Sequence, residues 1–334
     1  MSARAGQGRS GITGGPSGSW RGGRIGAILP IIAAVLCWAA ASLFVRYFSF
    51  HMDLHTQNFF RYLSASLVMA PVVAWIYPGC FSRYLRRWHT FLPLGALLVL
   101  FQVLWTASVY RLDIGFASML GKVGTLLITL IAFAVHPEER RVIRSPLFLA
   151  GLVLGFTGMA GVVAGLPNFK GGLAAAQKIG IILLLGSAVV WAIYANIIRS
   201  VLKSENGLQT FAFTCISTTI VYFPVFLAWG HPATLLHSGP GLSLLVAASG
   251  MIGIAGANSS YFISIKKIGL APSSNLVLAD TFVVALVSGP LFGEHLSPAQ
   301  WVFGLLLLSG CALVVRVSTS GRQKGARASA PTPL

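Results

Sequence analysis

The sequence predicts an all-α integral membrane protein with ten transmembrane helices, arranged as two inverted repeats of five helices each. Three observations predict this fold class. The composition is apolar and weakly charged, ten apolar runs are long enough to cross a bilayer, and a set of residues recurs at a nearly constant spacing in the two halves of the chain.

The composition is typical of a membrane protein. Hydrophobic residues make up 55% of the 334 residues and charged residues only 9%, whereas a soluble domain carries about 25% charged residues. The net charge of +17 would indicate nucleic-acid binding in a soluble protein. Here the basic residues lie between apolar runs and in the tails, so we expect a lipid bilayer around the chain and no nucleic-acid partner.

Apolar runs of about 20 residues are long enough for a helix to cross the hydrocarbon. The ten predicted spans are residues 25–47, 57–77, 91–110, 114–135, 146–166, 179–199, 208–229, 241–264, 271–292 and 299–317. The first run is longer than the apolar part of a signal peptide, so we expect it to be retained. The expected units are a disordered basic tail (1–24), two repeats (25–166 and 179–317) joined by a linker (167–178), and a second basic tail (318–334).

The distribution of basic residues predicts the orientation. With the N-terminus inside, 18 of the 24 Lys and Arg residues fall in cytoplasmic segments and four in outside segments. Cytoplasmic loops of membrane proteins carry an excess of Lys and Arg. We therefore expect a multi-pass protein of the cell (inner) membrane with both termini in the cytoplasm.

The repeat is visible as pairs of equal residues at a nearly constant spacing. The pairs are Trp38 and Trp191, Arg46 and Arg199, and Pro71 and Pro224 at a spacing of 153, then Gly115 and Gly269 at 154 and Glu138 and Glu294 at 156. Because five is an odd number of crossings, the second copy enters the membrane from the opposite side. Such inverted repeats recur in secondary transporters.

These residues carry a family resemblance. The chain resembles the EamA-type members of the drug/metabolite transporter superfamily over residues 25–317. The resemblance rests on Trp38 and Trp191, on Arg61, on the run from Lys266 to Ala271, and on the Pro137–Glu138 and Gly293–Glu294 turns. It implies export or exchange of small polar metabolites. The chain departs from the family at Gly124–Thr125 and Asp280–Thr281, where members often carry a proline that bends the fourth and ninth spans.

The function that we predict is secondary active transport by alternating access, with a central cavity between the third, fourth, eighth and ninth spans. A passive channel or facilitator for a small solute is the alternative, although a channel would favour a continuous polar stripe or charged rings. The sequence lacks a clustered nucleophile, base or metal set, and it lacks a P-loop. We therefore expect no enzyme activity, no cofactor and no metal.

Two charged residues of opposite sign lie near the middle of equivalent spans. Asp280 lies about nine residues into the ninth span, where a carboxylate costs about 2.5–3.5 kcal/mol on insertion scales. Lys122 lies about eight residues into the fourth span, about 12 Å from its end, which is too far for full snorkelling. We expect either substrate or proton binding, with the two forming a switchable ion pair, or permanently paired charges that only hold helices together.

Other polar residues in apolar spans are candidates for the cavity wall. Arg61 is either an interfacial arginine that snorkels to the bilayer surface or a contact for a substrate carboxylate or phosphate. Gln102, Trp105, Asn258 and Tyr261 either line the path or cross-link helices.

Three further expectations concern packing and partners. Glycine stripes in the fifth and tenth spans predict close helix packing, and the same surfaces leave a homodimer open. Glu294 is expected to face the N-terminus of the helix that follows it. The solute, the direction of transport and the choice between proton coupling and exchange stay open.

Overall fold

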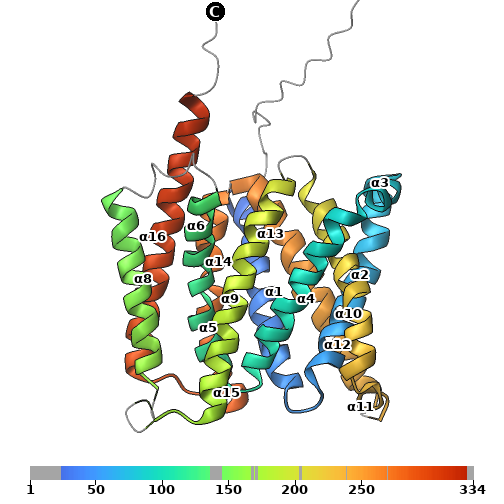
Figure 1. Cartoon of the computed structure of the whole chain (residues 1–334), viewed down its shortest axis with the longest axis horizontal. Helices are drawn as coiled ribbons and strands as arrows, with labels where there is room; N and C mark the ends of the chain where they lie inside the picture. The colour runs from blue at the N-terminus through green and yellow to red at the C-terminus, as the bar shows by residue number, and fades with distance from the viewer. Residues whose placement is uncertain are drawn as a thin grey trace, which may run out of the picture.

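The protein is a bundle of helices that run roughly parallel to one common direction (Figure 1). It is described here from a computed structural model, which covers residues 24–135, 145–166, 169, 172–202, 205–237, 239–268 and 270–328. Nearly all of the predicted N-terminal tail, the last six residues of the predicted C-terminal tail (329–334) and the segment that carries Glu138 lie outside these residues. The rest of the predicted C-terminal tail, 318–328, continues the last helix of the chain rather than being disordered.

The two halves contain equivalent elements in the same order, with one exception. The first half comprises α1 (Arg24–Phe48), α2 (Leu54–Ile76), α3 (Cys80–Arg86), α4 (Trp88–Val109), α5 (Ile114–Gly121), α6 (Val123–Val135) and α8 (Pro146–Ala164). The second half comprises α9 (Ala175–Leu202), α10 (Gly207–Trp229), α11 (Pro232–His237), α12 (Pro240–Gly250), the π-helix η2 (Met251–Gly256), α13 (Ala257–Ile268), α14 (Leu270–Val277), α15 (Asp280–Phe292) and α16 (Pro298–Ala328). Even the short α3 has a short counterpart, α11, at the same place in the second copy. The exception is α4 of the first half, which corresponds to three elements, α12, η2 and α13, in the second.

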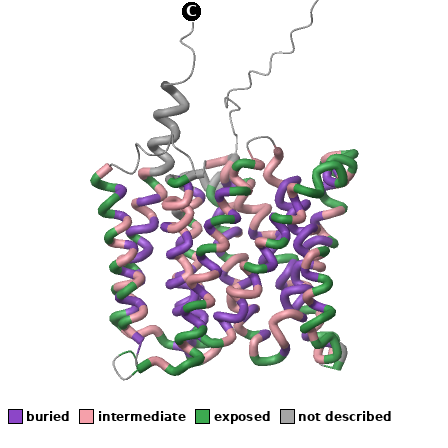
Figure 2. The backbone as a smooth tube through the Cα atoms, viewed as in Figure 1, coloured by how far each residue is buried: buried purple, intermediate pink, exposed green. Residues whose placement is uncertain are grey.

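The helices have the length and composition of membrane spans. Among the described residues, nine helices are long and apolar enough to cross a bilayer, and Asp280–Phe292 is a shorter apolar helix that ends the predicted ninth span. Figure 2 shows many exposed residues along the outward faces of the bundle, and these include large apolar side chains such as Trp75 and Leu286. Lipid is the environment that such faces require. The first helix begins and the last helix ends at the same end of the bundle (Figure 1), so the prediction of ten crossings in two repeats is confirmed.

The packing follows the repeat. The contact of α1 with α13 has its counterpart in that of α9 with α4, and the contact of α1 with α15 has its counterpart in that of α9 with α6. The equivalent helices α2 and α10 pack directly on each other, and Ser66 Oγ lies 2.9 Å from Thr219 Oγ1. The two residues are separated in the sequence by the repeat spacing of 153 residues. A residue meets its own equivalent only on a symmetry axis, so the pseudo-two-fold axis passes between α2 and α10.

The glycine stripe of the fifth span is buried within the chain. A Cβ atom on Gly158 would lie 2.3 Å from the backbone nitrogen of Leu307, and one on Gly310 would lie 2.4 Å from that of Gly155. Small residues allow two helix backbones to approach this closely. The stripe therefore holds α8 against α16, its own repeat equivalent.

The predicted fourth and ninth spans are not continuous helices, which corrects the sequence expectation. The fourth is divided between α5 and α6 at Lys122, and the ninth between α14 and α15 at residues 278–279. Neither break contains a proline, so the missing family proline does not leave these spans straight. The apolar run continues across each break, and this is why periodicity alone did not reveal it.

A backbone group left without a helical hydrogen bond at the first break finds its partner at the second. The Lys122 N–H donates to the Met119 carbonyl at 3.2 Å instead of the Ser118 carbonyl four residues back. The carbonyl of Ser118 instead accepts a hydrogen bond from Thr281 Oγ1 at 3.4 Å. Because buried backbone groups need partners in a membrane, this contact ties the break in one repeat to the break in the other.

Candidate functional site

The site is built around an ion pair that joins the two breaks. Lys122 Nζ lies 2.7 Å from Asp280 Oδ1 and donates to Oδ2 at 2.9 Å. The two side chains retain 19% and 14% exposure, so the pair is enclosed but not sealed. The structure thus brings together the two residues that the sequence singled out for their opposite charges.

The helix ends explain why these residues suit their positions. Lys122 directly follows the C-terminus of α5, and Asp280 is the first residue of α15. A helix carries a partial negative charge at its C-terminus and a partial positive charge at its N-terminus. Each side chain therefore has the sign that its helix end favours, and Thr281 Oγ1 adds a hydrogen bond of 3.2 Å to Asp280 Oδ1.

Aromatic side chains lie beside the first break. Gly121 and Gly124 flank Lys122, and a Cβ on either would lie 3.2 Å from the Trp105 ring and 3.6 Å from the Trp191 ring, respectively. The absence of side chains at the two glycines leaves room for both indoles. Trp105 therefore lies beside the break at Lys122.

A second aromatic pair reaches the other broken span. The Tyr261 ring lies 5.3 Å from that of Trp38, and its hydroxyl lies 2.9 Å from Ser274 Oγ on α14. Trp38 and Trp191 are repeat equivalents, so each half places one tryptophan near the divided helices. The repeated tryptophans were recognised in the sequence. Only the fold shows that Trp191 lies beside the first break and that Trp38 contacts the second broken span through Tyr261.

The two predicted amide residues take part in different backbone contacts. Asn258 Nδ2 donates to the Ile254 carbonyl in η2 at 2.8 Å, four residues back in the chain. Gln102 is buried, and its backbone carbonyl accepts from Asn58 Nδ2 of α2 at 3.4 Å, in a cluster where Thr106 Oγ1 donates to Asn58 Oδ1. The Asn258 amide thus bonds locally, and near Gln102 it is the Asn58 side chain that links α2 to α4.

Arg61 does not snorkel to the bilayer surface, so that expectation is wrong. Its residue exposure is only 3%, and the guanidinium lies inside the bundle, near Gly253 of η2. The sequence indicated depth along α2, but which side of the helix faces the interior was decided by the packing of α12 and η2 against it.

Glu294 forms a contact that the sequence analysis missed. Its Oε1 lies 2.5 Å from Arg46 Nε, and its Oε2 accepts the backbone N–H of Ile114 at 2.7 Å. It therefore faces the N-terminus of α5 rather than that of α16, the helix that follows it. Burial raises the pKa of the Glu294 carboxyl above its usual range, against the opposing effect of Arg46. Both residues belong to the repeated set, and that was the only signal in the sequence.

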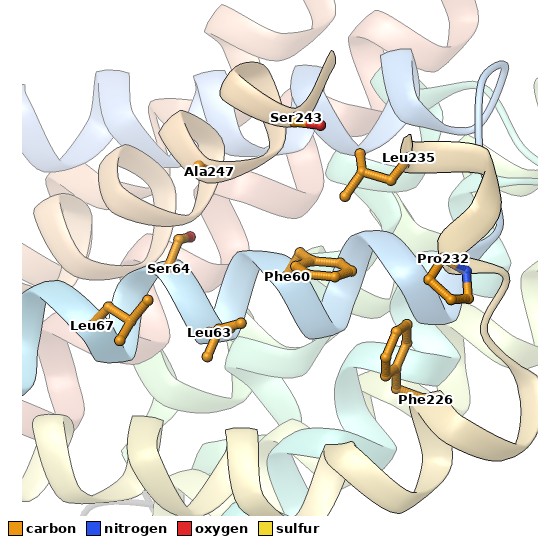
Figure 3. Close-up of a pocket in the computed structure, with 9 residues that line it drawn as sticks. All are labelled: Phe60, Leu63, Ser64, Leu67, Phe226, Pro232, Leu235, Ser243 and Ala247. Carbon is orange, nitrogen blue, oxygen red and sulfur yellow. The ribbon is translucent and has the colours of Figure 1, made fainter. Parts of the chain in front are cut away.

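A groove elsewhere on the bundle has a different character. It measures about 570 Å³ and lies between α2, α10, α11 and α12 (Figure 3). Its lining is almost entirely apolar: Phe60, Leu63, Ser64, Leu67, Phe226, Pro232, Leu235, Ser243 and Ala247. None of the predicted site residues lines it, so it is distinct from the cavity that we expect between the third, fourth, eighth and ninth spans.

Comparison with known proteins matches both halves of the chain to one family. The sequence pattern described as the EamA-like transporter family matches residues 25–164 and again residues 178–316. The chain is 27% identical over 152 residues to the uncharacterized transporter YwfM of Bacillus subtilis (strain 168). This match covers 45% of the chain and 49% of YwfM, so the chain spans about half the length of that relative. A crystal structure described only as that of a protein superposes with a TM-score of 0.60 at 17% identity, over 87% of this chain and 97% of that one, which supports the fold alone.

Proposed function

Because the chain belongs to the EamA-like transporter family, we propose that it is a secondary active transporter that exports or exchanges small polar metabolites by alternating access. The observation that carries this proposal is the Lys122–Asp280 ion pair, which bridges the two repeats at the broken helices. Discontinuous helices at the repeat interface are where transporters of inverted-repeat design hold their solutes and coupling ions.

The pair is suited to act as a switch. Its two members belong to different repeats, so rocking of one repeat against the other would change the distance between Lys122 Nζ and Asp280 Oδ1. Separating the charges inside a membrane is costly unless other charges replace them. Charged groups of the solute, or a proton on Asp280, would lower that cost and couple solute binding to the change of access.

The orientation in the cell membrane is part of the same proposal. The basic helix α3, with Arg83 and Arg86, lies at the end of the bundle where α1 begins (Figure 1). The excess of basic residues on cytoplasmic loops favours this end as the cytoplasmic one. The contact between Arg46 and Glu294 then belongs to the outer end, where it would close the path from outside.

Counterflow in proteoliposomes tests the proposal. Vesicles are loaded with unlabelled amino acids, nucleosides or organic acids, and uptake of the same labelled solute is followed. We expect trans-stimulation for at least one solute, and a loss of about tenfold or more in Lys122→Ala and in Asp280→Ala. The double variant should be no worse than the worse single variant, because the two residues act as one unit.

An exposed lysine supplies a matched control. Lys178→Ala removes the same residue type as Lys122→Ala at an exposed position, and it should leave counterflow unchanged. Uptake without trans-stimulation would indicate a channel and would overturn the proposal. Additive losses in the double variant would show that the pair does not act as a switch.

A further inference from the structure

Arg61 is a cation held deep inside the bundle. It is the eighth residue of α2, so it lies about 10 Å along the helix from its start. With 3% exposure it has no route to the bilayer surface. Its Nε and Nη1 atoms make no hydrogen bond to any described residue, and one helical turn earlier the buried Gln57 Oε1 is also without a partner.

The surroundings of Arg61 are closely packed and distorted. A Cβ on Gly250 would lie 2.1 Å from the Arg61 carbonyl oxygen, and one on Gly253 would lie 3.8 Å from Arg61 Nη2. Gly253 belongs to the π-helix η2, and π-helical turns are frequent at functional sites. The distortion thus lies directly at the guanidinium, between α1, α2 and η2.

No described carboxylate neutralises this charge. The sequence has seven acidic residues, and the structure describes five of them, each engaged elsewhere. Asp53 caps α2, Asp113 and Glu294 lie beside Arg46, Glu205 pairs with Arg83 and Arg87, and Asp280 pairs with Lys122. The other two, Glu138 and Glu139, lie outside the described residues. An unpaired charge inside a membrane protein is costly and is typical of a ligand or ion pathway.

Both features break the repeat at the same place. The repeat equivalent of Arg61 is Thr214, whose hydroxyl donates to the Thr210 carbonyl of its own helix at 2.7 Å. The equivalent of α12, η2 and α13 is α4, which is a continuous α-helix. Residues that serve only the architecture have no reason to differ between the copies, whereas a single solute needs only one binding group.

We propose that Arg61 binds the anionic group of the transported solute, and that this solute carries one net negative charge. The inference rests on the proposed transport function and names the solute class. Lys122 and Asp280 neutralise one another, so Arg61 leaves one positive charge among the ionisable residues that lie deep in the described spans. A monocarboxylate makes the loaded bundle neutral, whereas a cation would double the excess charge and a dianion would reverse its sign. The guanidinium also matches the planar, two-oxygen geometry of a carboxylate.

Ligand binding to the purified protein tests the inference. Thermal stabilisation is measured in alkaline buffer, where inorganic phosphate is a dianion, with acetate, lactate and benzoate, and with inorganic phosphate and choline as probes of other charge. We expect the monocarboxylates to stabilise the wild type more than phosphate, and choline to have no effect. In Arg61→Gln their apparent affinity should fall by at least about tenfold, as for loss of a charge-assisted hydrogen bond.

The controls separate binding from folding. Arg61→Lys keeps the positive charge but loses the paired N–H donors of the guanidinium. It should therefore retain weaker monocarboxylate binding, even if Arg61→Gln does not fold. Arg111→Gln removes an exposed arginine at the end of α4 and should bind as the wild type does. If no monocarboxylate stabilises the wild type, or if Arg61→Lys and Arg61→Gln bind as the wild type does, the inference is wrong. Binding of phosphate as tight as that of a monocarboxylate would overturn the single-charge assignment.

Counterflow distinguishes this inference from the proposed function. Monocarboxylate binding that needs Arg61, without counterflow of any solute, would support the anion site and contradict transport. Counterflow of a neutral or cationic solute that is unchanged in Arg61→Gln would support transport and contradict the anion site.

Discussion

Lys122 and Arg61 are both cations deep inside membrane spans, but the fold places them in opposite circumstances. Lys122 lies at a helix break, keeps some exposure and pairs with Asp280 at 2.7 Å. Arg61 lies in an unbroken helix, is 3% exposed and has no carboxylate partner among the described residues. A paired charge supports the fold that holds it, whereas an unpaired one weakens it and is retained for another reason. The comparison therefore indicates that Lys122 stabilises the fold, whereas Arg61 is retained for its function.

The largest expected effect comes from removing the partner of Lys122. In Asp280→Asn the ammonium stays inside the bundle without its carboxylate, so the free energy of unfolding should fall by about 3 kcal/mol. Denaturant unfolding in detergent micelles measures this loss. Lys122→Met in the same background removes the orphaned charge and should restore part of the stability. A double variant that is less stable than Asp280→Asn would contradict this view of the pair.

Removing Arg61 should have the opposite sign. Arg61→Met replaces an unpaired buried cation by an apolar side chain of similar length, so we expect the free energy of unfolding to stay equal or to rise by about 1 kcal/mol. Counterflow of the solute should nevertheless be lost, which is the trade-off expected at a functional site. The same unfolding assay, with Arg111→Met as control, checks the sign. A loss as large as that of Asp280→Asn would make Arg61 a structural cross-link.

Glu294 tests a paired charge outside the spans. Because its pKa is raised in the folded protein, the folded state binds its proton more tightly than the unfolded state does. The free energy of unfolding should therefore be highest below the usual carboxyl pKa and should fall as the pH rises through the raised value. Glu294→Gln keeps a hydrogen-bond acceptor but does not titrate, so it should remove this decline. A pH profile of unfolding that is unchanged in the variant would contradict the assignment.

The smallest effect concerns the contact between the breaks. Thr281→Val removes the hydroxyl that reaches the Ser118 carbonyl, so we expect a loss of about 0.6 kcal/mol, the average for such contacts in membrane proteins. Thr218→Val is the matched control, because its buried hydroxyl donates to the Thr214 carbonyl of its own helix. Equal losses in the two variants would mean that the contact between the repeats adds nothing.

Much of the architecture was predictable from the sequence. Ten apolar runs and the spacing of 153 residues predicted the spans and the inverted repeat, and Ser66 and Thr219 now meet at that spacing. The opposite charges of Lys122 and Asp280 were recognised at similar depths in equivalent spans. The helix breaks beside them were not predicted, because the hydrophobic pattern of a span does not change when one residue in it departs from helical geometry.

Two site residues illustrate the limit of sequence reasoning. Periodicity gives depth and a helix face, but the face of α2 that carries Arg61 became buried only because Gly250 and Gly253 let α12 and η2 pack against it. Glu294 was recognised as a repeated residue at a helix start. Its partners Arg46 and Ile114 lie far away in the chain, and no local pattern predicts such a contact.

The sequence by itself determined the membrane class, the number of crossings and the doubling, because hydrophobic length and repeat spacing are properties of the chain alone. The tertiary structure decided where the spans break, which charges meet and which charge has no carboxylate partner among the described residues. The physical reason is that pairing depends on distances between helices, and these follow from how closely the backbones pack, as at Gly158 and Gly250. In the low-dielectric interior of the bundle, those distances decide whether a buried cation is paired and stabilises the fold, or is unpaired and can bind an anionic ligand.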